Sequence, residues 1–119
     1  MELTLLTVAD CPHAAVFEER LAVALAGHPG VVLRRRVVAG DREAAAAGMH
    51  GSPTLLVDGV DPFARPGEAA SLSCRLYPGA AGEAGGVPSV AALRAALSRE
   101  GRARSVTGAG RGGSAGGRR

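Results

Sequence analysis

The sequence has no tryptophan, no lysine and only three aromatic side chains among its 119 residues. Proteins that bind single-stranded nucleic acid use exposed aromatic rings on which bases stack, so this class is disfavoured. No apolar run approaches the roughly 20 residues of a membrane-spanning helix, and the amino-terminal segment lacks the basic start of a signal peptide. Two cysteines far apart in the chain do not make a disulfide scaffold. We therefore expect a cytoplasmic protein with reduced thiols and no membrane partner.

Positive charge is distributed unevenly along the chain. The 14 basic residues, all arginine, exceed the 11 acidic residues and give a formal net charge of +3. Residues 101–119 hold five arginines and no acid, so residues 1–100 carry nine arginines against 11 acids, a net charge of −2. The seven glycines of residues 101–119 add a composition typical of disorder. The sequence thus predicts one domain over 1–100, a disordered Arg/Gly-rich tail over 101–119, and no specific nucleic-acid partner.

Hydrophobic periodicity predicts that strands and helices alternate in the domain. Strands are expected over residues 2–8, 31–38, 52–57 and 71–77, and helices after an N-cap at Asp10, over about 41–48, and from Ser89 to about Arg99. Three consecutive arginines, Arg34 to Arg36, favour an edge position for the second strand. Asp58-Gly59 is a strong hairpin signal. The expected fold is α/β, with a parallel βαβ unit, a β-hairpin and a carboxyl-terminal helix around a mixed four-stranded sheet.

Cys11 is the first candidate for chemistry, because it lies between the first strand and the first helix. Unpaired N–H groups and the helix dipole at a helix start favour a thiolate and lower the pKa of a thiol. His13 can add positive charge when it is protonated. The alternative interpretation is that Cys11 is a small apolar residue that packs at a helix start without reacting.

Two short motifs together resemble the thioredoxin-like superfamily. Cys11-Pro12-His13-Ala14 occupies the place of the Cys-x-x-Cys motif, and Ser52-Pro53-Thr54 occupies that of the cis-proline before the third core strand. The resemblance covers about residues 2–99, and it implies a cis Ser52–Pro53 bond and a role in thiol chemistry. The candidate catalytic residues are Cys11, with His13 beside it in the sequence and Cys74 as a candidate resolving thiol, and the resemblance implies that Pro12, Ser52, Pro53 and Thr54 bind substrate.

The motif departs from the family where the second cysteine is replaced by Ala14, which leaves no adjacent resolving thiol. Cys11 could act as a monothiol, as in monothiol glutaredoxins, with an external thiol such as glutathione or a mycothiol-type thiol. Alternatively, Cys74 could be the resolving thiol, or the fold could serve as a non-catalytic interaction module. We expect a monomer with no bound cofactor or metal, and a small thiol or a protein disulfide as its partner.

The segment Ser71 to Tyr77 gives a further alternative. Its sequence, Ser-Leu-Ser-Cys-Arg-Leu-Tyr, resembles a segment of small thioredoxin-like proteins that are sometimes labelled alkylmercury lyase. That resemblance implies soft-metal or organomercury handling by two thiolates, Cys11 and Cys74, with a proton from one of Asp10, Asp58 or Asp61. Other charged residues suggest no chemistry: we expect His50 and Asp61 in loops and Arg75 on the surface, on the face opposite Cys74.

Overall fold

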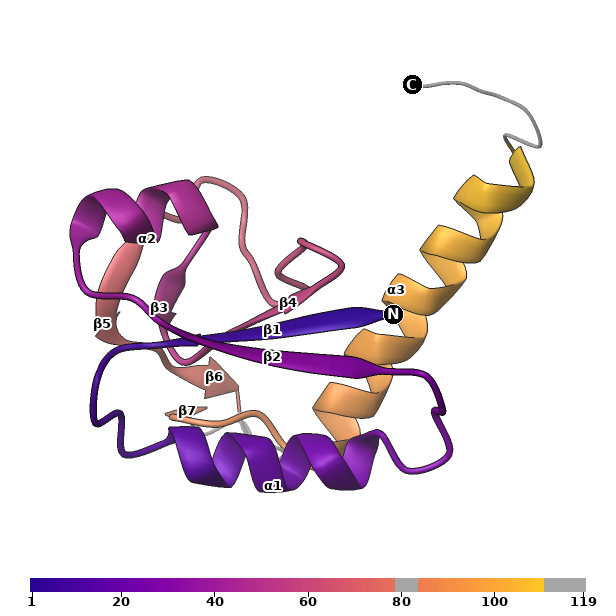
Figure 1. Ribbon diagram of the computed structural model, residues 1–119, viewed down its shortest axis with the longest axis horizontal. Helices are drawn as coiled ribbons and strands as arrows, with labels where there is room; N and C mark the ends of the chain where they lie inside the picture. The colour runs from indigo at the N-terminus through magenta and orange to yellow at the C-terminus, as the bar shows by residue number, and fades with distance from the viewer. Residues whose placement is uncertain (79–83, 111–119) are drawn as a thin grey trace.

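The computed structural model describes residues 1–78 and 84–110, and Figure 1 shows their arrangement. The chain follows the expected alternation of strands and helices. In order, the elements are β1 (Glu2–Thr7), α1 (Ala14–Ala24), β2 (Val32–Val37), α2 (Asp41–Ala47), β3 (His50–Ser52), β4 (Thr54–Val57), β5 (Ser71–Cys74), β6 (Tyr77–Pro78), β7 (Ala84–Gly85) and α3 (Val90–Gly110). Within the described residues, no helix is long and apolar enough to cross a membrane.

The central sheet has three strands in the order β2-β1-β4. Strand β1 runs parallel to β2 and antiparallel to β4, so the predicted parallel βαβ unit is confirmed. The predicted edge position of β2 is also confirmed, because β2 pairs only with β1 in this sheet. Each of its arginines forms an ion pair with a neighbouring glutamate: Arg34 with Glu2 at 2.5 Å, Arg35 with Glu18 at 2.7 Å and Arg36 with Glu43 at 3.0 Å.

The prediction of one four-stranded sheet with a hairpin is wrong in its second half. The strand expected over 52–57 is found as β4, which begins after Pro53, while an unpredicted strand, β3, ends before Pro53 and pairs in parallel with β5 outside the central sheet. The Asp58-Gly59 turn forms and brings Val57 opposite Val60, but no second hairpin strand follows. The physical reason lies in residues 61–70, which include Pro62 and Pro66; prolines have no N–H to donate to a growing sheet.

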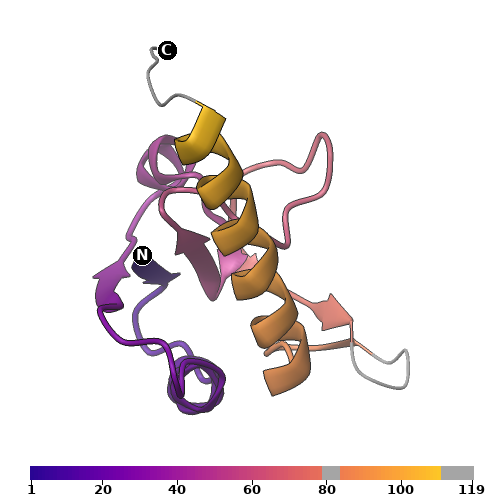
Figure 2. The ribbon, with the colours of Figure 1, turned by 90° about the vertical axis from the view of Figure 1, so that its right-hand side faces the viewer.

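Apolar side chains from both faces of β1 form two clusters. Leu3 and Leu5 pack in a cluster with Phe17 and Leu21 of α1 and with Leu93 of α3, whereas Leu6 packs in the other cluster with Ala44 of α2. Because alternate residues of a strand point to opposite faces, α1 and α3 cover one face of the sheet and α2 the other. Figure 2 looks nearly along α1 and shows α3 crossing it steeply.

The last helix continues beyond its predicted end. Helix α3 begins at Val90, close to the expected start, but extends to Gly110 rather than ending near Arg99. Its carboxyl-terminal turns extend away from the sheet (Figure 1). Residues 79–83 and 111–119 lie outside the described residues, and the predicted disorder of the last part of the tail falls there.

Candidate functional site

Cys11 lies in a turn that precedes α1. The N–H of Ala14 donates to the Cys11 carbonyl at 3.3 Å, and the helix proper begins with Phe17 donating to the His13 carbonyl at 3.0 Å. The predicted N-cap at Asp10 is wrong, because Asp10 has a φ of +57° and the N-cap position is taken by His13, without a side-chain cap bond. With its backbone in the left-handed region, Asp10 belongs to a turn that precedes α1, and the N-cap position follows three residues later. Cys11 is therefore half-buried, one turn before the helix instead of inside it.

The His13 ring lies against a second segment of the chain, at Gly86. A Cβ placed on Gly86 would lie 2.6 Å from three atoms of the His13 ring, so the backbone at Gly86 covers the imidazole closely. The Arg20 side chain fastens the next residues to α1, since its guanidinium donates to the carbonyls of Val87 at 3.3 Å and Pro88 at 3.2 Å. The segment after β7 thus closes over the start of α1, and His13 is half-buried under it.

Ser52 connects the two segments that carry the cysteines. Its hydroxyl accepts a hydrogen bond from the N–H of Val8 at 3.0 Å, three residues before Cys11. Its backbone lies opposite Cys74 in the parallel pairing of β3 with β5, and its carbonyl accepts from the N–H of Arg75 at 3.1 Å. The Ser52–Pro53 peptide bond is cis, the geometry that the family resemblance implies. Ser52 therefore contacts both the segment that precedes Cys11 and the strand that carries Cys74.

The predicted substrate-binding residues differ in their accessibility. Pro12 is exposed, but Pro53 is buried, and Ser52 and Thr54 are only 2% and 0% exposed. A substrate approaching this structure would find almost no surface on the Ser52–Thr54 turn. These three residues therefore offer little accessible surface, whereas Pro12, Cys11 and Cys74 are at least partly accessible.

Both cysteines are free thiols in unlike surroundings. Cys11 is half-buried in its turn, whereas Cys74 at the end of β5 is exposed. Of the carboxylates considered for an organomercury reaction, Asp61 is engaged in ion pairs and Asp58 accepts a hydrogen bond from the N–H of Glu2 at 2.8 Å, whereas Asp10 directly precedes Cys11 in the chain. Across the part of the chain that the structure describes, no three cysteine, histidine or acidic side chains gather into a set that could hold a metal ion.

The largest departure from the sequence analysis is a buried ionic network next to Cys74. The expectation that Arg75 is a surface charge is wrong, because its side chain is only 5% exposed. Its guanidinium donates to Asp61 at 2.6 Å and to the Thr54 hydroxyl at 3.4 Å. The Asp61 carboxylate, 3% exposed, also bonds Nδ1 of His50 at 2.8 Å, so Asp61 and His50 are not free loop residues either.

Tyr77 completes this network on its apolar side. Its ring contacts Phe17 and Phe63 edge to face, with centroids 6.0 and 5.2 Å apart, and the Arg75 guanidinium lies 4.9 Å from the ring centroid. Its hydroxyl donates to the carbonyl of Pro53. Burial raises the pKa of the Tyr77 hydroxyl well above its ordinary value, against the opposing effect of Arg75, so the hydroxyl remains a donor at neutral pH.

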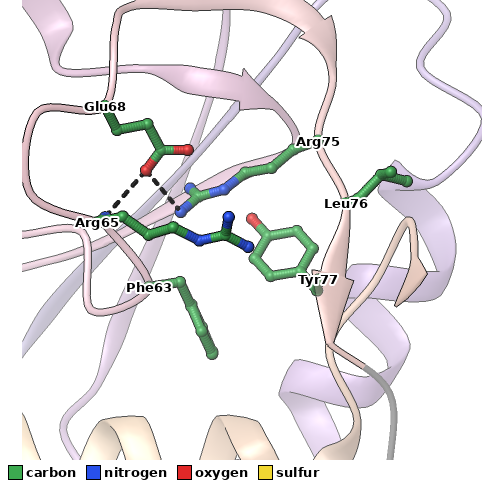
Figure 3. A pocket seen from close by; sticks show the side chains of 6 residues that line it. All are labelled: Phe63, Arg65, Glu68, Arg75, Leu76 and Tyr77. Carbon is green, nitrogen blue, oxygen red and sulfur yellow. Dashed lines mark hydrogen bonds and ion pairs between the residues drawn. The ribbon is translucent and has the colours of Figure 1, made fainter. Parts of the chain in front are cut away.

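A small pocket opens beside the network (Figure 3). Its volume is about 100 Å³, and its lining consists of Phe63, Arg65, Glu68, Arg75, Leu76 and Tyr77. Glu68 accepts from the N–H of Arg65 at 3.1 Å and lies 3.8 Å from the Arg75 guanidinium. Leu76, which is 62% exposed, stands at the side of the pocket away from these charges.

The error about Arg75 follows from one wrong assumption about strand faces. A surface position for Arg75 on the face opposite Cys74 implies that the face of Cys74 and Leu76 is the inner one, yet Arg75 and Tyr77 are buried and Leu76 is exposed. A signal was available: Tyr77 is the only tyrosine of a chain with few aromatic side chains, and so large a ring is a strong candidate for the core. The chain also breaks between β5 and β6, which a single strand did not anticipate.

Comparison with protein-family models, with curated proteins and with solved structures finds no match to this chain. The site is therefore interpreted from its own geometry.

Proposed function

We propose that this protein carries out thiol–disulfide exchange at Cys11. The observation that supports this proposal is the double connection of Ser52, whose hydroxyl holds Val8 before Cys11 and whose backbone faces Cys74. The two free thiols, 63 residues apart in the sequence, thus belong to segments that both contact one buried turn. Cys11 is half-buried, which suits a nucleophile, and Cys74 is exposed, which suits a thiol that meets external partners.

The reaction has two steps. In the first, the Cys11 thiolate attacks one sulfur of a substrate disulfide, a bond forms between them, and the other substrate sulfur leaves as a thiolate that takes up a proton. In the second step, another thiolate breaks the mixed disulfide. Attack on the Cys11 sulfur forms a new disulfide with Cys11 and releases the substrate as a thiolate, whereas attack on the substrate sulfur releases Cys11 as a thiolate. The second thiolate is supplied by Cys74 or by an external thiol of the glutathione or mycothiol type, because Ala14 provides none.

His13 and Pro12 complete the proposed site. His13 lies two residues after Cys11, and its ring is fixed by the covering backbone of Gly86. A protonated imidazole close to a cysteine can stabilise the thiolate form of that cysteine. Pro12 is the exposed neighbour of Cys11 and is the surface that a substrate disulfide would contact.

The test compares mixed-disulfide formation in three proteins: the wild type, Cys11→Ser and Cys74→Ser. Each is reacted with glutathione disulfide at neutral pH, quenched with acid over time, and read by mass spectrometry. We expect a glutathione adduct on Cys11 in the Cys74→Ser variant, forming faster than the adduct on Cys74 in the Cys11→Ser variant, although Cys74 is the more exposed thiol. If Cys74 reacts as fast or faster, accessibility alone explains the reactivity and the proposal fails.

The same experiment separates the two sources of the second thiol. If Cys74 resolves the mixed disulfide, the wild type first gains glutathione and then releases it as an intramolecular Cys11–Cys74 disulfide forms. If an external thiol is needed, the adduct persists in the wild type until reduced glutathione is added. The latter outcome keeps the exchange activity and assigns it to a monothiol mechanism.

A further inference from the structure

Three interactions from one short stretch of chain hold the buried Ser52–Thr54 turn. The N–H of Arg75 donates to the Ser52 carbonyl at 3.1 Å, and the Arg75 guanidinium reaches the Thr54 hydroxyl at 3.4 Å. The Tyr77 hydroxyl donates to the Pro53 carbonyl. Each residue of the turn thus receives one hydrogen bond from Arg75 or Tyr77. This stretch follows Cys74 directly in the sequence.

The two side chains that make these bonds are themselves fixed. Arg75 is held by Asp61 at 2.6 Å, and the pocket-lining Glu68 lies 3.8 Å from the same guanidinium. Tyr77 is held between the rings of Phe17 and Phe63. Side chains that are already ordered lose little further freedom when they bond, so they can position a neighbouring turn accurately.

The turn passes this restraint to the thiol site. Ser52 holds the end of β1 through the N–H of Val8 at 3.0 Å, and Cys11 follows three residues later. The residue before the turn also packs closely against Arg75, since a Cβ on Gly51 would lie 2.8 Å from the Cβ of Arg75. A continuous set of contacts therefore connects Arg75 and Tyr77 with the backbone at Val8, three residues before Cys11.

We infer that Arg75 and Tyr77 are positioning residues that hold the Ser52–Thr54 turn, and through it Cys11, in the geometry needed for thiol–disulfide exchange. This inference rests on the proposed function, because its main consequence is an effect on exchange at Cys11. Neither residue takes part in a bond-making step. They set the fraction of molecules in which the Cys11 segment is correctly placed, and the exchange rate follows that fraction.

The test uses Tyr77→Phe in the Cys74→Ser background, so that Cys11 is the only reactive thiol. The substitution keeps the ring and its aromatic contacts and removes only the hydroxyl that bonds Pro53. We expect the rate constant for exchange with glutathione disulfide to fall about fivefold, the equivalent of one net hydrogen bond. Alkylation of Cys11 by iodoacetamide, which has no leaving sulfur to align, should change much less.

Leu97→Val in the same background is the control for stability alone. Leu97 lies on α3 in the core cluster that also contains Tyr77, but it makes none of the hydrogen bonds to the turn. The substitution removes one methylene group from the core, which lowers Tm without touching the Ser52–Thr54 turn. If Leu97→Val slows exchange as much as Tyr77→Phe does, the effect is general destabilisation and the inference is overturned. Unchanged exchange in Tyr77→Phe would overturn it as well.

A second readout keeps the inference testable if the wild type shows no exchange and the proposed function itself fails. Amide hydrogen exchange is measured for Val8 and Arg75, whose N–H groups both donate to Ser52, and for Ala44 in α2 as a reference. We expect Tyr77→Phe to lower the protection of Val8 and Arg75 severalfold while Ala44 is unaffected. Equal protection in both proteins at all three amides would show that Tyr77 does not hold the turn.

Discussion

At the scale of single residues, the strongest constraint in this protein is the buried pairing of Asp61 with Arg75. Both side chains are nearly inaccessible, at 3% and 5% exposure, and the carboxylate also accepts a hydrogen bond from Nδ1 of His50 at 2.8 Å. Removing two charges from water is costly, and the cost is recovered only while both partners are present and hydrogen-bonded. The network is thus more sensitive to loss of one member than the exposed ion pairs of β2.

Replacement of Asp61 should test this directly. Asp61→Asn leaves the Arg75 guanidinium buried without its principal counter-charge, and we expect the free energy of unfolding to fall by about 3–5 kcal/mol in urea titrations at neutral pH. Glu68→Gln is the matched control, because Glu68 is 26% exposed and lies 3.8 Å from Arg75. The control should cost less than about 1 kcal/mol. Equal losses in the two variants would mean that Arg75 is not buried as described.

Tyr77 offers a pH-dependent measurement at the same scale. Burial raises the pKa of its hydroxyl above the ordinary value of about 10, so the neutral phenol is favoured by folding. The stability that it contributes is fully present below the pKa of the unfolded chain and is lost as pH rises toward the folded pKa. We expect wild-type stability to decline above about pH 10 more steeply than that of Tyr77→Phe.

The composition makes the Tyr77 titration simple to read. The chain has one tyrosine and no tryptophan, so the near-ultraviolet tyrosinate band reports Tyr77 alone. In native protein the band should appear at higher pH than in protein unfolded by urea. Coincident titrations in the two conditions would contradict the burial of this hydroxyl.

At the scale of elements, the close approach of β3 to β5 depends on Gly51. This glycine has a φ of +121°, and a Cβ there would lie 2.8 Å from the Arg75 Cβ and 3.0 Å from the Ser73 carbonyl. A side chain would therefore be strained by its backbone angles and would also push β5 away from the Ser52–Thr54 turn. The pairing that brings Cys74 opposite Ser52 requires a glycine at this position.

Comparison of two glycine substitutions tests how closely β3 packs against β5 at Gly51. Gly67 also has a positive φ, +76°, but nothing lies within 4 Å of a Cβ placed there. Gly67→Ala thus carries the backbone strain alone, whereas Gly51→Ala carries strain and collision. We expect Gly51→Ala to be the less stable by a further 1–3 kcal/mol, roughly the cost of overpacking, in urea unfolding. A difference below about 0.5 kcal/mol would show that β3 and β5 adjust freely.

The elements also show what sequence reasoning could and could not reach. The parallel βαβ unit and the edge position of β2 were predictable, since the apolar runs and three consecutive arginines are local signals. The partner of β5 was not, because pairing β3 with β5 depends on Pro53 separating β3 from β4 and on a loop of ten residues, 61–70. The same non-local pairing decides that Arg75 and Tyr77 point inward, so the buried network was missed with it.

For the candidate site, the local motifs did not predict the surroundings of Cys11 or the burial of the Ser52–Thr54 turn. Asp10 was expected to cap the helix, and its positive φ instead adds a turn before α1. The turn residues were expected to face substrate, yet Ser52 and Thr54 are buried. Burial depends on packing from β5 and β6, which a motif of three residues does not contain.

At the scale of the whole molecule, the charge excess and the candidate site belong to different parts of the sequence. The turn between β1 and α1 lies at the opposite side of Figure 1 from the carboxyl-terminal end of α3. Residues 111–119 contain three arginines and no acid, so their removal takes the formal charge from +3 to 0. Exposed charges separated by more than about 8–10 Å are largely screened at physiological salt. The terminal arginines should therefore have little influence on the Cys11 thiol.

Deletion of residues 111–119 separates these two properties. We expect the truncated chain to lose retention on a cation exchanger at neutral pH, while the rate of alkylation of Cys11 by iodoacetamide stays within about twofold of wild type, because screening removes most of the long-range field. A full-length chain with Arg111, Arg118 and Arg119 replaced by glutamine is the control for charge without truncation, and it should behave like the deletion in both assays. A large fall in Cys11 reactivity in the deletion alone would show that these last residues contact the fold. A large fall in both variants would show that the charge of the three arginines affects the thiol.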